Sequence, residues 1–324
     1  MRKLLILMVS AVGLFLFYFT FQAAAAVFYT DWDLPDAGEQ DENVPRVVLI
    51  TNETDHPFWR DVAAGAEKKA GELNVDLDVS GIYGSNTEDF LRKIEIAIYS
   101  KVDGIIVQGL DNEKFKELTK LKAASYGIPV LTVAHDVPKE ESLRKTYIGS
   151  DQFEAGELLA RELLEDMGTT GEVILMMDSE PEYFQRQRLE GVEHVLAGYP
   201  DIEMIEAKIG DREQGLSTVN DLLNHFPQAT SFLAVNASFT EELVKEIETR
   251  RKVDPYYIYT FDEERGAYAL LESGKIDGVV EQSPEDMGQL SVELMSDWLQ
   301  KDSQPLDIEG YFTEVSIVKD LNGQ

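Results

Sequence analysis

Two neighbouring aromatic side chains, Phe58 and Trp59, follow a short apolar run and a polar loop. Residues 47–50 are apolar without interruption, which suits a parallel strand that helices cover on both faces. Pro57 fits the first turn of a helix, where its missing N–H would have no partner anyway. Both rings should then stand beyond the carboxyl end of a strand, where α/β proteins bind ligands. Together they favour a ligand platform, although each ring alone could equally staple its helix to the core.

Three polar side chains, Asn236, Asp262 and Gln282, each directly follow a later apolar run. The carboxyl ends of parallel strands meet at one edge of a sheet, so these side chains should gather at such an edge. Amide and carboxylate groups there can exchange hydrogen bonds with a polar ligand. The pattern therefore predicts a polar binding site.

The sequence offers less support for a catalytic site than for a binding site. The four histidines have no metal-ligand spacing, and neither a GxxxxGKS or GxxxxGKT phosphate loop nor a GxSxG nucleophile elbow occurs. Asp136 and Asp262 could form a glycosidase pair, because sequence separation does not exclude the roughly 5–10 Å that such carboxylates need. Accepting hydrogen bonds from ligand hydroxyls is the simpler interpretation. We therefore expect no enzyme activity, no metal and no cofactor.

The composition sets the size and excludes several classes of partner and chemistry. A chain of 324 residues is long enough for two domains with separate cores. Its 61 acidic and 29 basic residues give a net charge of −32, which would repel nucleic acid. The absence of cysteine excludes disulfides, thiolate catalysis, Cys-ligated zinc and attachment to lipid through an N-terminal cysteine.

The N-terminus has the pattern of a membrane anchor or a signal peptide. Arg2 and Lys3 precede a mostly apolar run to residue 28 that is long enough to span a bilayer. Residues 23–26 are alanines that suit signal cleavage, but the run continues past them into aromatics, which favours an uncleaved anchor. Either alternative places the rest of the chain outside the cytoplasm. Residues 29–43 are acidic and contain Gly and Pro, which indicates a flexible tether.

Beyond residue 44, short aliphatic runs alternate with longer amphipathic ones, the pattern of βα units in doubly wound parallel sheets. The expected strands cover residues 46–51, 75–82, 104–107, 129–133, 172–177, 202–207, 231–235, 256–261, 277–280 and 311–318. The expected helices cover residues 57–73, 87–100, 113–126, 151–167, 184–197, 213–225, 240–250, 264–272 and 284–300. The sequence thus predicts an α/β protein with two halves of like architecture.

Eight motifs in this order resemble the periplasmic sugar-binding proteins of the ribose-binding type, a type I periplasmic binding protein family that shares its fold with LacI-type regulators. They are HPFW (56–59), VDGIIVQG (102–109), GIPVLTVAHD (127–136), IGSDQFEAG (148–156), QRQRLEG (185–191), FLAVN (232–236), TFDE (260–263) and GVVEQSPEDMG (278–288).

The resemblance implies two lobes joined by three crossovers, near Ser150, Gln282 and Gly310, with a ligand cleft between them. The N-terminal lobe would comprise residues 44–150 and 283–310. The C-terminal lobe would comprise residues 151–282 and 311–324.

The resemblance also implies roles for individual residues. Phe58 and Trp59 match the stacking pair of the family, Arg186 matches its binding arginine, and Asn86 stands where an amide can reach a hydroxyl. Asn236, Asp262 and Gln282 complete the implied set. The family's aspartate and arginine after the fourth strand are replaced, because this chain has Ala134, His135 and Asp136 there. His135 and Asp136 are therefore either ligand contacts or surface residues near the hinge, and a second stacking ring would come from Tyr183 or Phe184 or be absent.

The function so implied is extracytoplasmic binding of a monosaccharide or related polyol with closure of the lobes. The N-terminal segment and the missing cysteine favour a membrane-tethered sensor accessory to a histidine kinase. The alternative is the substrate-binding component of a sugar ABC transporter, whose partner would be an ABC permease, and a glycoside-acting enzyme is a third, weaker alternative. A DNA-binding regulator is set aside, because the apolar segment stands where a helix-turn-helix head would be.

Overall fold

The computed structural model divides the chain into two units, Met1–Val44 and Pro45–Gln324. It describes residues 15, 17–20, 44–84, 86–210, 212–236, 239–250, 255–261, 266–300 and 305–319. No helix within these ranges is long and apolar enough to cross a membrane. Most of the predicted anchor at residues 1–28 and all of the predicted tether at residues 29–43 lie outside the described residues.

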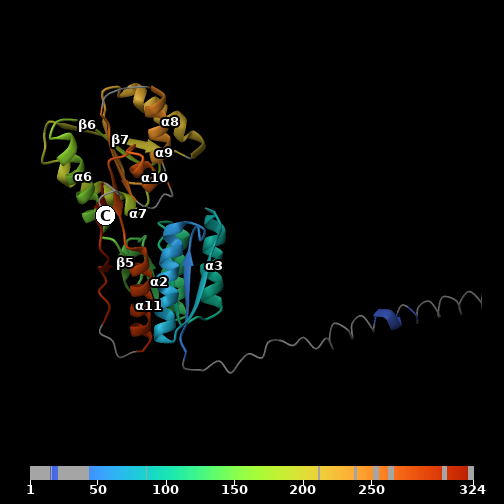
Figure 1. Cartoon of the computed structure of the whole chain (residues 1–324). Coiled ribbons are helices and arrows are strands. Elements are labelled where there is room, and N and C mark those ends of the chain that lie inside the picture. Colours follow the sequence, from blue (N-terminus) through green and yellow to red (C-terminus); the bar gives the residue numbers. More distant parts are fainter. Residues whose placement is uncertain are drawn as a thin grey trace, which may run out of the picture. The chain divides into compact units, whose positions relative to one another are not determined.

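The second unit contains two six-stranded sheets (Figure 1). The first has the order β11-β5-β4-β3-β1-β2, and all of its neighbouring strands run parallel. Its strands are β1 (Arg46–Thr51), β2 (Asp76–Gly81), β3 (Gly104–Gln108), β4 (Val130–Val133), β5 (Tyr147–Gly149) and β11 (Tyr311–Phe312). The order reverses between β1 and β3, as in a doubly wound sheet.

The second sheet has the matching order β12-β10-β9-β8-β6-β7. It is parallel except for its edge strand β12, which runs antiparallel to β10. Its strands are β6 (Gly171–Asp178), β7 (Ile202–Ile209), β8 (Ser231–Ala234), β9 (Tyr257–Phe261), β10 (Gly278–Glu281) and β12 (Ser316–Val318). The prediction of two doubly wound α/β lobes is therefore confirmed.

Helices cover both faces of each sheet. The first lobe carries α2 (Pro57–Leu73), α3 (Thr87–Tyr99), α4 (Glu113–Glu117), the π-helix η1 (Leu118–Ala123), α5 (Lys139–Ser142) and α11 (Pro284–Leu299). The second lobe carries α6 (Gln152–Met167), α7 (Tyr183–Leu196), α8 (Arg212–His225), α9 (Thr240–Arg250) and α10 (Ala267–Glu272). Figure 1 shows α11 lying beside α2, although the two helices come from opposite ends of the chain.

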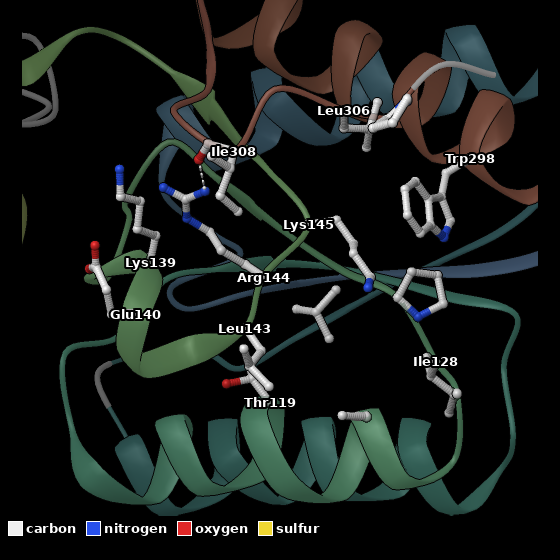
Figure 2. A pocket seen from close by; sticks show the side chains of 15 residues that line it. Thr119, Ile128, Lys139, Glu140, Leu143, Arg144, Lys145, Trp298, Leu306 and Ile308 are labelled. Carbon is white, nitrogen blue, oxygen red and sulfur yellow. Dashed lines mark hydrogen bonds between the residues drawn. The ribbon is translucent and has the colours of Figure 1, made fainter.

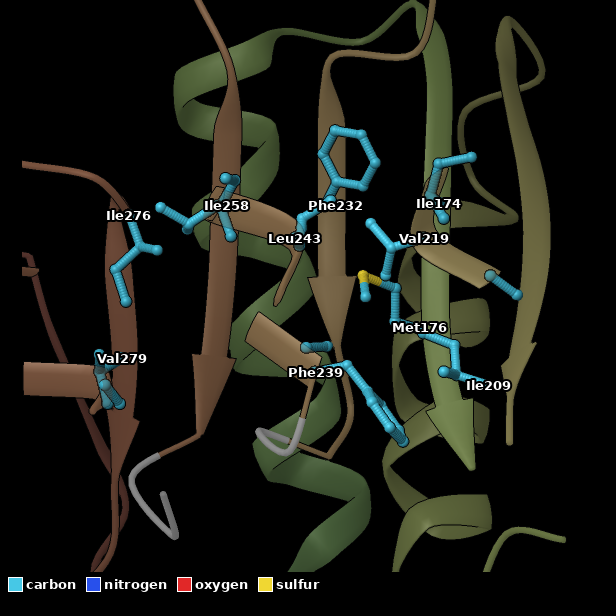
Figure 3. Close-up of a cluster of buried hydrophobic side chains, with 14 of the residues drawn as sticks. Ile174, Met176, Ile209, Val219, Phe232, Phe239, Leu243, Ile258, Ile276 and Val279 are labelled. Atoms are coloured by element: carbon cyan, nitrogen blue, oxygen red, sulfur yellow. The ribbon is translucent and has the colours of Figure 1, made fainter. Parts of the chain in front are cut away.

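The uninterrupted apolar runs of the strands follow from this double cover. Val47 and Leu49 pack into one core cluster, whereas Val48 and Ile50 pack into another on the opposite face, because successive side chains of a strand point to opposite faces. The second sheet is built in the same way. Figure 3 shows one of its two clusters, in which Ile174 of β6 packs with side chains of neighbouring elements.

The chain crosses between the sheets three times. It passes from β5 to α6, from β10 to α11, and from β11 to β12. The third crossing, predicted near Gly310, lies after Phe312, because Tyr311 and Phe312 still pair with Ile148 and Gly149 of the first sheet. Each crossing joins one sheet to the other, so the chain forms two lobes that meet along a common hinge.

Candidate functional site

A cavity of about 180 Å³ lies between the two lobes. Such a volume is smaller than the roughly 300–1,000 Å³ of pockets for drug-sized ligands, so it suits a small molecule. The first lobe lines it with Asn52, Glu53, His56, Phe58, Trp59, Gln108 and His135, and the second with Asp178, Glu182, Phe184, Gln185 and Asn236.

The strands place most of these side chains. Asn52 directly follows β1, Gln108 ends β3, Asp178 ends β6, and Asn236 stands two residues after β8. All four are thus at the carboxyl edges of the two parallel sheets, next to the point where each strand order reverses. This is where doubly wound sheets bind ligands.

Aromatic rings form a continuous group across the cavity. Phe58 meets Trp59 edge-on, with centroids 5.3 Å apart, and Trp59 meets His135 in the same way at 5.4 Å. His135 stacks on Phe184 at 4.1 Å with an interplanar angle of 15°. Because Phe184 belongs to α7 and His135 to the first lobe, this stack joins the two lobes. Flat apolar ring faces of this kind suit the apolar face of a sugar.

Polar groups of the second lobe converge on Asp178. Its Oδ2 accepts hydrogen bonds from Gln185 Nε2 and from Asn236 Nδ2, the latter at 2.8 Å. In the first lobe, Gln108 Oε1 accepts from the backbone N–H of Asn52 at 2.7 Å. The side-chain Oδ1 of Asn52 is buried and has no hydrogen-bond partner within the described structure. A buried acceptor in this state needs a donor from a ligand or from water.

Glu182 contributes an unusual carboxyl group. It stands at the N-cap of α7, but its side chain makes no capping hydrogen bond. Burial, together with the nearby carboxylates of Asp178 and Asp111, raises the pKa of Glu182 to about 7, while Arg186 acts in the opposite direction. Ionising this carboxyl group costs free energy. Groups of this kind are typical of functional sites, and helix capping does not explain this one.

A second hollow of about 620 Å³ adjoins the first and shares His56 and Phe58 with it. It extends to the hinge, where Gln282 lines it and accepts a hydrogen bond from Ser150 Oγ at 2.9 Å. The predicted site residue Asp262, which follows β9 in the sequence, lies outside the described residues.

The structure brings four of the predicted site residues, Phe58, Trp59, His135 and Asn236, to the cavity between the lobes, and a fifth, Gln282, to the adjoining hollow. Phe184, one of the two candidate rings of the second lobe, lies there as well.

Three predicted site residues, Asn86, Arg186 and Asp136, form other contacts and do not line the cavity. Asn86 caps α3, because its side chain accepts from the backbone N–H groups of Glu88 and Asp89. Arg186 crosses the cleft but pairs with Asp111 at 2.5 Å and lies outside the cavity lining.

Asp136 belongs to the interior of the first lobe. Its carboxylate forms a buried two-point contact with Arg144 at 2.6 and 2.7 Å, and it accepts a hydrogen bond from Thr132 Oγ1. Arg144 also donates to the carbonyl of Ile308, which ties the returning chain to the lobe. Asp136 therefore stabilises the interior of the first lobe, and we do not include it in the candidate site.

A larger hollow of about 660 Å³ lies within the first lobe, beside the amino end of β4 (Figure 2). Its lining is largely apolar, with Ile128, Leu306 and Trp298 among its members. Three of the charged groups around it are already engaged, since Lys145 stands over the Trp298 ring, Lys139 pairs with Glu309 and Arg144 pairs with Asp136. It touches one lobe and offers few open polar groups, so it suits a polar ligand less well than the cleft does.

No group of His, Cys, Asp and Glu that could hold a metal ion occurs in the part of the chain that the structure describes.

Comparison with known proteins relates the chain to solute-binding proteins. The family model described as "Periplasmic binding protein domain" matches residues 47–303. The ribose import binding protein RbsB of Bacillus subtilis (strain 168) is 23% identical over 254 residues, which cover 78% of this chain and 80% of that protein.

Solved structures of the same fold include a glucose-galactose binding protein, GanP, from Geobacillus stearothermophilus. It superposes with a TM-score of 0.78 at 28% identity and covers 86% of this chain and 98% of its own. A XylFII-LytSN complex matches with a TM-score of 0.72 at 23% identity, covering 85% of this chain and 98% of that one.

Proposed function

Because this chain belongs to the periplasmic binding protein domain family, we propose that it binds a monosaccharide or a related polyol between its lobes without changing it. Membership of this family implies a location outside the cytoplasm. The observation that carries the proposal is the cavity itself, in which stacked rings and polar strand ends from both lobes surround a small volume. The similarity to proteins named for ribose and for glucose and galactose supports a sugar as the ligand.

Binding requires the lobes to move. We propose that the lobes part along the three crossovers to admit a ligand to the cavity between them and then close on it. A ligand that touches both lobes stabilises the closed form through contacts that the open form lacks. We propose that this closure is the signal or the transport-competent state that a membrane partner recognises.

For the partner, we propose a sensor in the membrane, with an ABC permease as the alternative. The chain has no cysteine for lipid attachment, and its N-terminal run has the composition of a membrane anchor. One relative in fold was solved in complex with LytSN, whereas RbsB is named for import. N-terminal sequencing of the protein from isolated membranes would test the anchor, because loss of residues 1–28 would favour a secreted carrier.

Thermal unfolding in the presence of a panel of sugars tests the binding proposal. A true ligand at about 100 times its Kd should stabilise the protein by roughly 2.7 kcal/mol. Stabilisation by amino acids or peptides alone would contradict a sugar site. Release of product from a glycoside would revive the enzyme alternative, so the same sugars should be recovered unchanged after incubation.

A further inference from the structure

The lining of the cavity is acidic. Among its described residues there are three carboxylates, Glu53, Asp178 and Glu182, and no lysine or arginine. The adjoining hollow repeats this imbalance, with the carboxylates of Asp55, Asp61 and Glu281 against the single arginine Arg60. A ligand in the cavity therefore lies near carboxyl groups. No lysine or arginine is among the described side chains that line the cavity.

Two arginines of α7, Arg186 and Arg188, are engaged in other contacts. Arg186 donates to Asp111 at 2.5 Å and to the carbonyl of Pro181 at 2.7 Å. Arg188 is fully buried, donates to Gln152 and to the carbonyl of Val235, and stands 3.5 Å over the ring of Phe261. Neither guanidinium belongs to the lining of the cavity.

Two acceptor groups of the cavity have no hydrogen-bond donor among the described residues. Asn52 Oδ1 is buried without a partner, and in the described structure the Glu182 carboxylate forms no hydrogen bond and no ion pair. The amide donors of Gln185 and Asn236 are directed at Asp178. An ammonium group, with three donors, no acceptor and a positive charge, complements such a set better than a hydroxyl does.

We propose that the cleft selects an amino sugar, and that Glu182 is the carboxylate that receives its ammonium group. This inference rests on the proposed function and adds the charge of the ligand to it. Buried carboxylates are stable only when paired with positive charge or well hydrogen-bonded, and the ligand supplies both here. For the same reason sugar acids and sugar phosphates should be rejected.

Isothermal titration calorimetry at a pH of about 7 tests the inference, because this pH is at the pKa of Glu182 and below the range of roughly 7.7–8.0 in which amino groups of this type titrate. The probes are glucosamine, galactosamine and mannosamine, each compared with its parent hexose and with glucuronate. One amino sugar should bind roughly tenfold or more tightly than its parent hexose, because a charge-assisted hydrogen bond replaces a neutral one. Glucuronate should give no heat of binding.

Glu182→Gln should lower the ratio of the two affinities at least about fivefold. Glu180→Gln is the matched control, because Glu180 is exposed, stands two residues away and lies outside the cavity lining, so it should leave the ratio unchanged. Thermal unfolding of both variants checks that they fold.

Equal binding of an amino sugar and its parent hexose to the unaltered protein would overturn the inference while leaving the proposed function intact. An unchanged ratio in Glu182→Gln would overturn the role of Glu182. Binding of none of the sugars would overturn the inference and the proposed function together.

Discussion

Glu182 makes the stability of the protein depend on pH. Burial, Asp178 and Asp111 raise its pKa to about 7 in the folded protein, above the value near 4.3 expected in an unfolded chain. Between these two values the folded state holds a proton that the unfolded state has lost. Stability from this group therefore falls as the pH rises from about 4.5 through 7, and the loss is complete above that range.

Glu182→Gln should remove this loss of stability at high pH. At pH 8 and without ligand we expect the variant to be more stable than the unaltered protein by about 3–4 kcal/mol, since the pKa is raised from near 4.3 to about 7 and each pKa unit corresponds to about 1.4 kcal/mol. At pH 4.5 the two should be alike. Urea unfolding at both pH values measures the difference, with Glu180→Gln as the control, and equal stabilities at pH 8 would mean that Glu182 is not buried as described.

Part of the candidate site could be predicted from the sequence. Polar residues that directly follow apolar strands identified Asn236, and the same rule applied evenly would also have found Asn52, Gln108 and Asp178. Glu182 could not be found in this way, because it stands at the start of a helix and its burial depends on how the lobes meet. Asp136 was misleading because its partner Arg144 becomes visible only once the chain is folded.

At the scale of elements, glycines set how the helices pack. A methyl group added to Gly65 of α2 would lie 2.0 Å from the carbonyl oxygen of Glu285, and one added to Gly288 of α11 would lie 1.9 Å from that of Val62. The two helices therefore touch backbone to backbone. In the second lobe, a methyl group added to Gly156 of α6 would lie 2.0 Å from the carbonyl oxygen of Arg188 in α7. In each lobe, a helix that carries cavity residues, α2 or α7, thus packs closely against a helix that follows a crossover, α11 or α6.

Gly65→Ala should destabilise the protein by roughly 1–3 kcal/mol or more, because neither backbone can move away without separating the helices. Gly71→Ala on the same helix is the matched control. Nothing lies within 4 Å of the added methyl group there, so alanine should stabilise by about 0.4–1 kcal/mol through its better helix propensity. Denaturant unfolding of both variants measures the contrast, and equal effects would show that α2 and α11 are not in close contact.

Two helices that start at the cleft have no side-chain cap, as is also the case for α5, α10 and α11. Asn86, Asn112 and Asp151 cap α3, α4 and α6 through side-chain hydrogen bonds, whereas α2 and α7 begin without such a cap. The N–H groups of these two first turns therefore remain available to ligand oxygens or water. Sequence patterns predicted where these helices begin, but the missing caps could be assigned only from the structure.

At the scale of the whole molecule, two of the contacts among the described residues join the lobes across the cleft. They are the stack of His135 on Phe184 and the ion pair of Arg186 with Asp111. Arg186 was predicted as a ligand contact, and here it acts between the lobes. Because its side chain is 42% exposed, the pair should contribute no more than about 1 kcal/mol.

Asp111→Asn should shift the equilibrium towards the open form. Without ligand, small-angle scattering should give a larger radius of gyration than that of the unaltered protein, and ligand affinity should fall by up to about fivefold. Glu113→Gln is the control, because its side chain is 96% exposed and lies in the same loop and helix start without reaching the second lobe. An unchanged radius together with an unchanged affinity would show that the ion pair does not favour closure.

The glycine crossing of α2 and α11 also governs the order in which the chain can fold during synthesis. It joins segments far apart, as the contact between Lys68 and Glu285 over 217 positions shows. The second lobe is nearly continuous from β6 to β10 and leaves the ribosome before α11 does. Until α11 arrives, the apolar face of the first sheet lacks one of its covering helices. The lobe that is translated first therefore cannot complete its core until α11 is made, after the whole stretch from β6 to β10 has been translated.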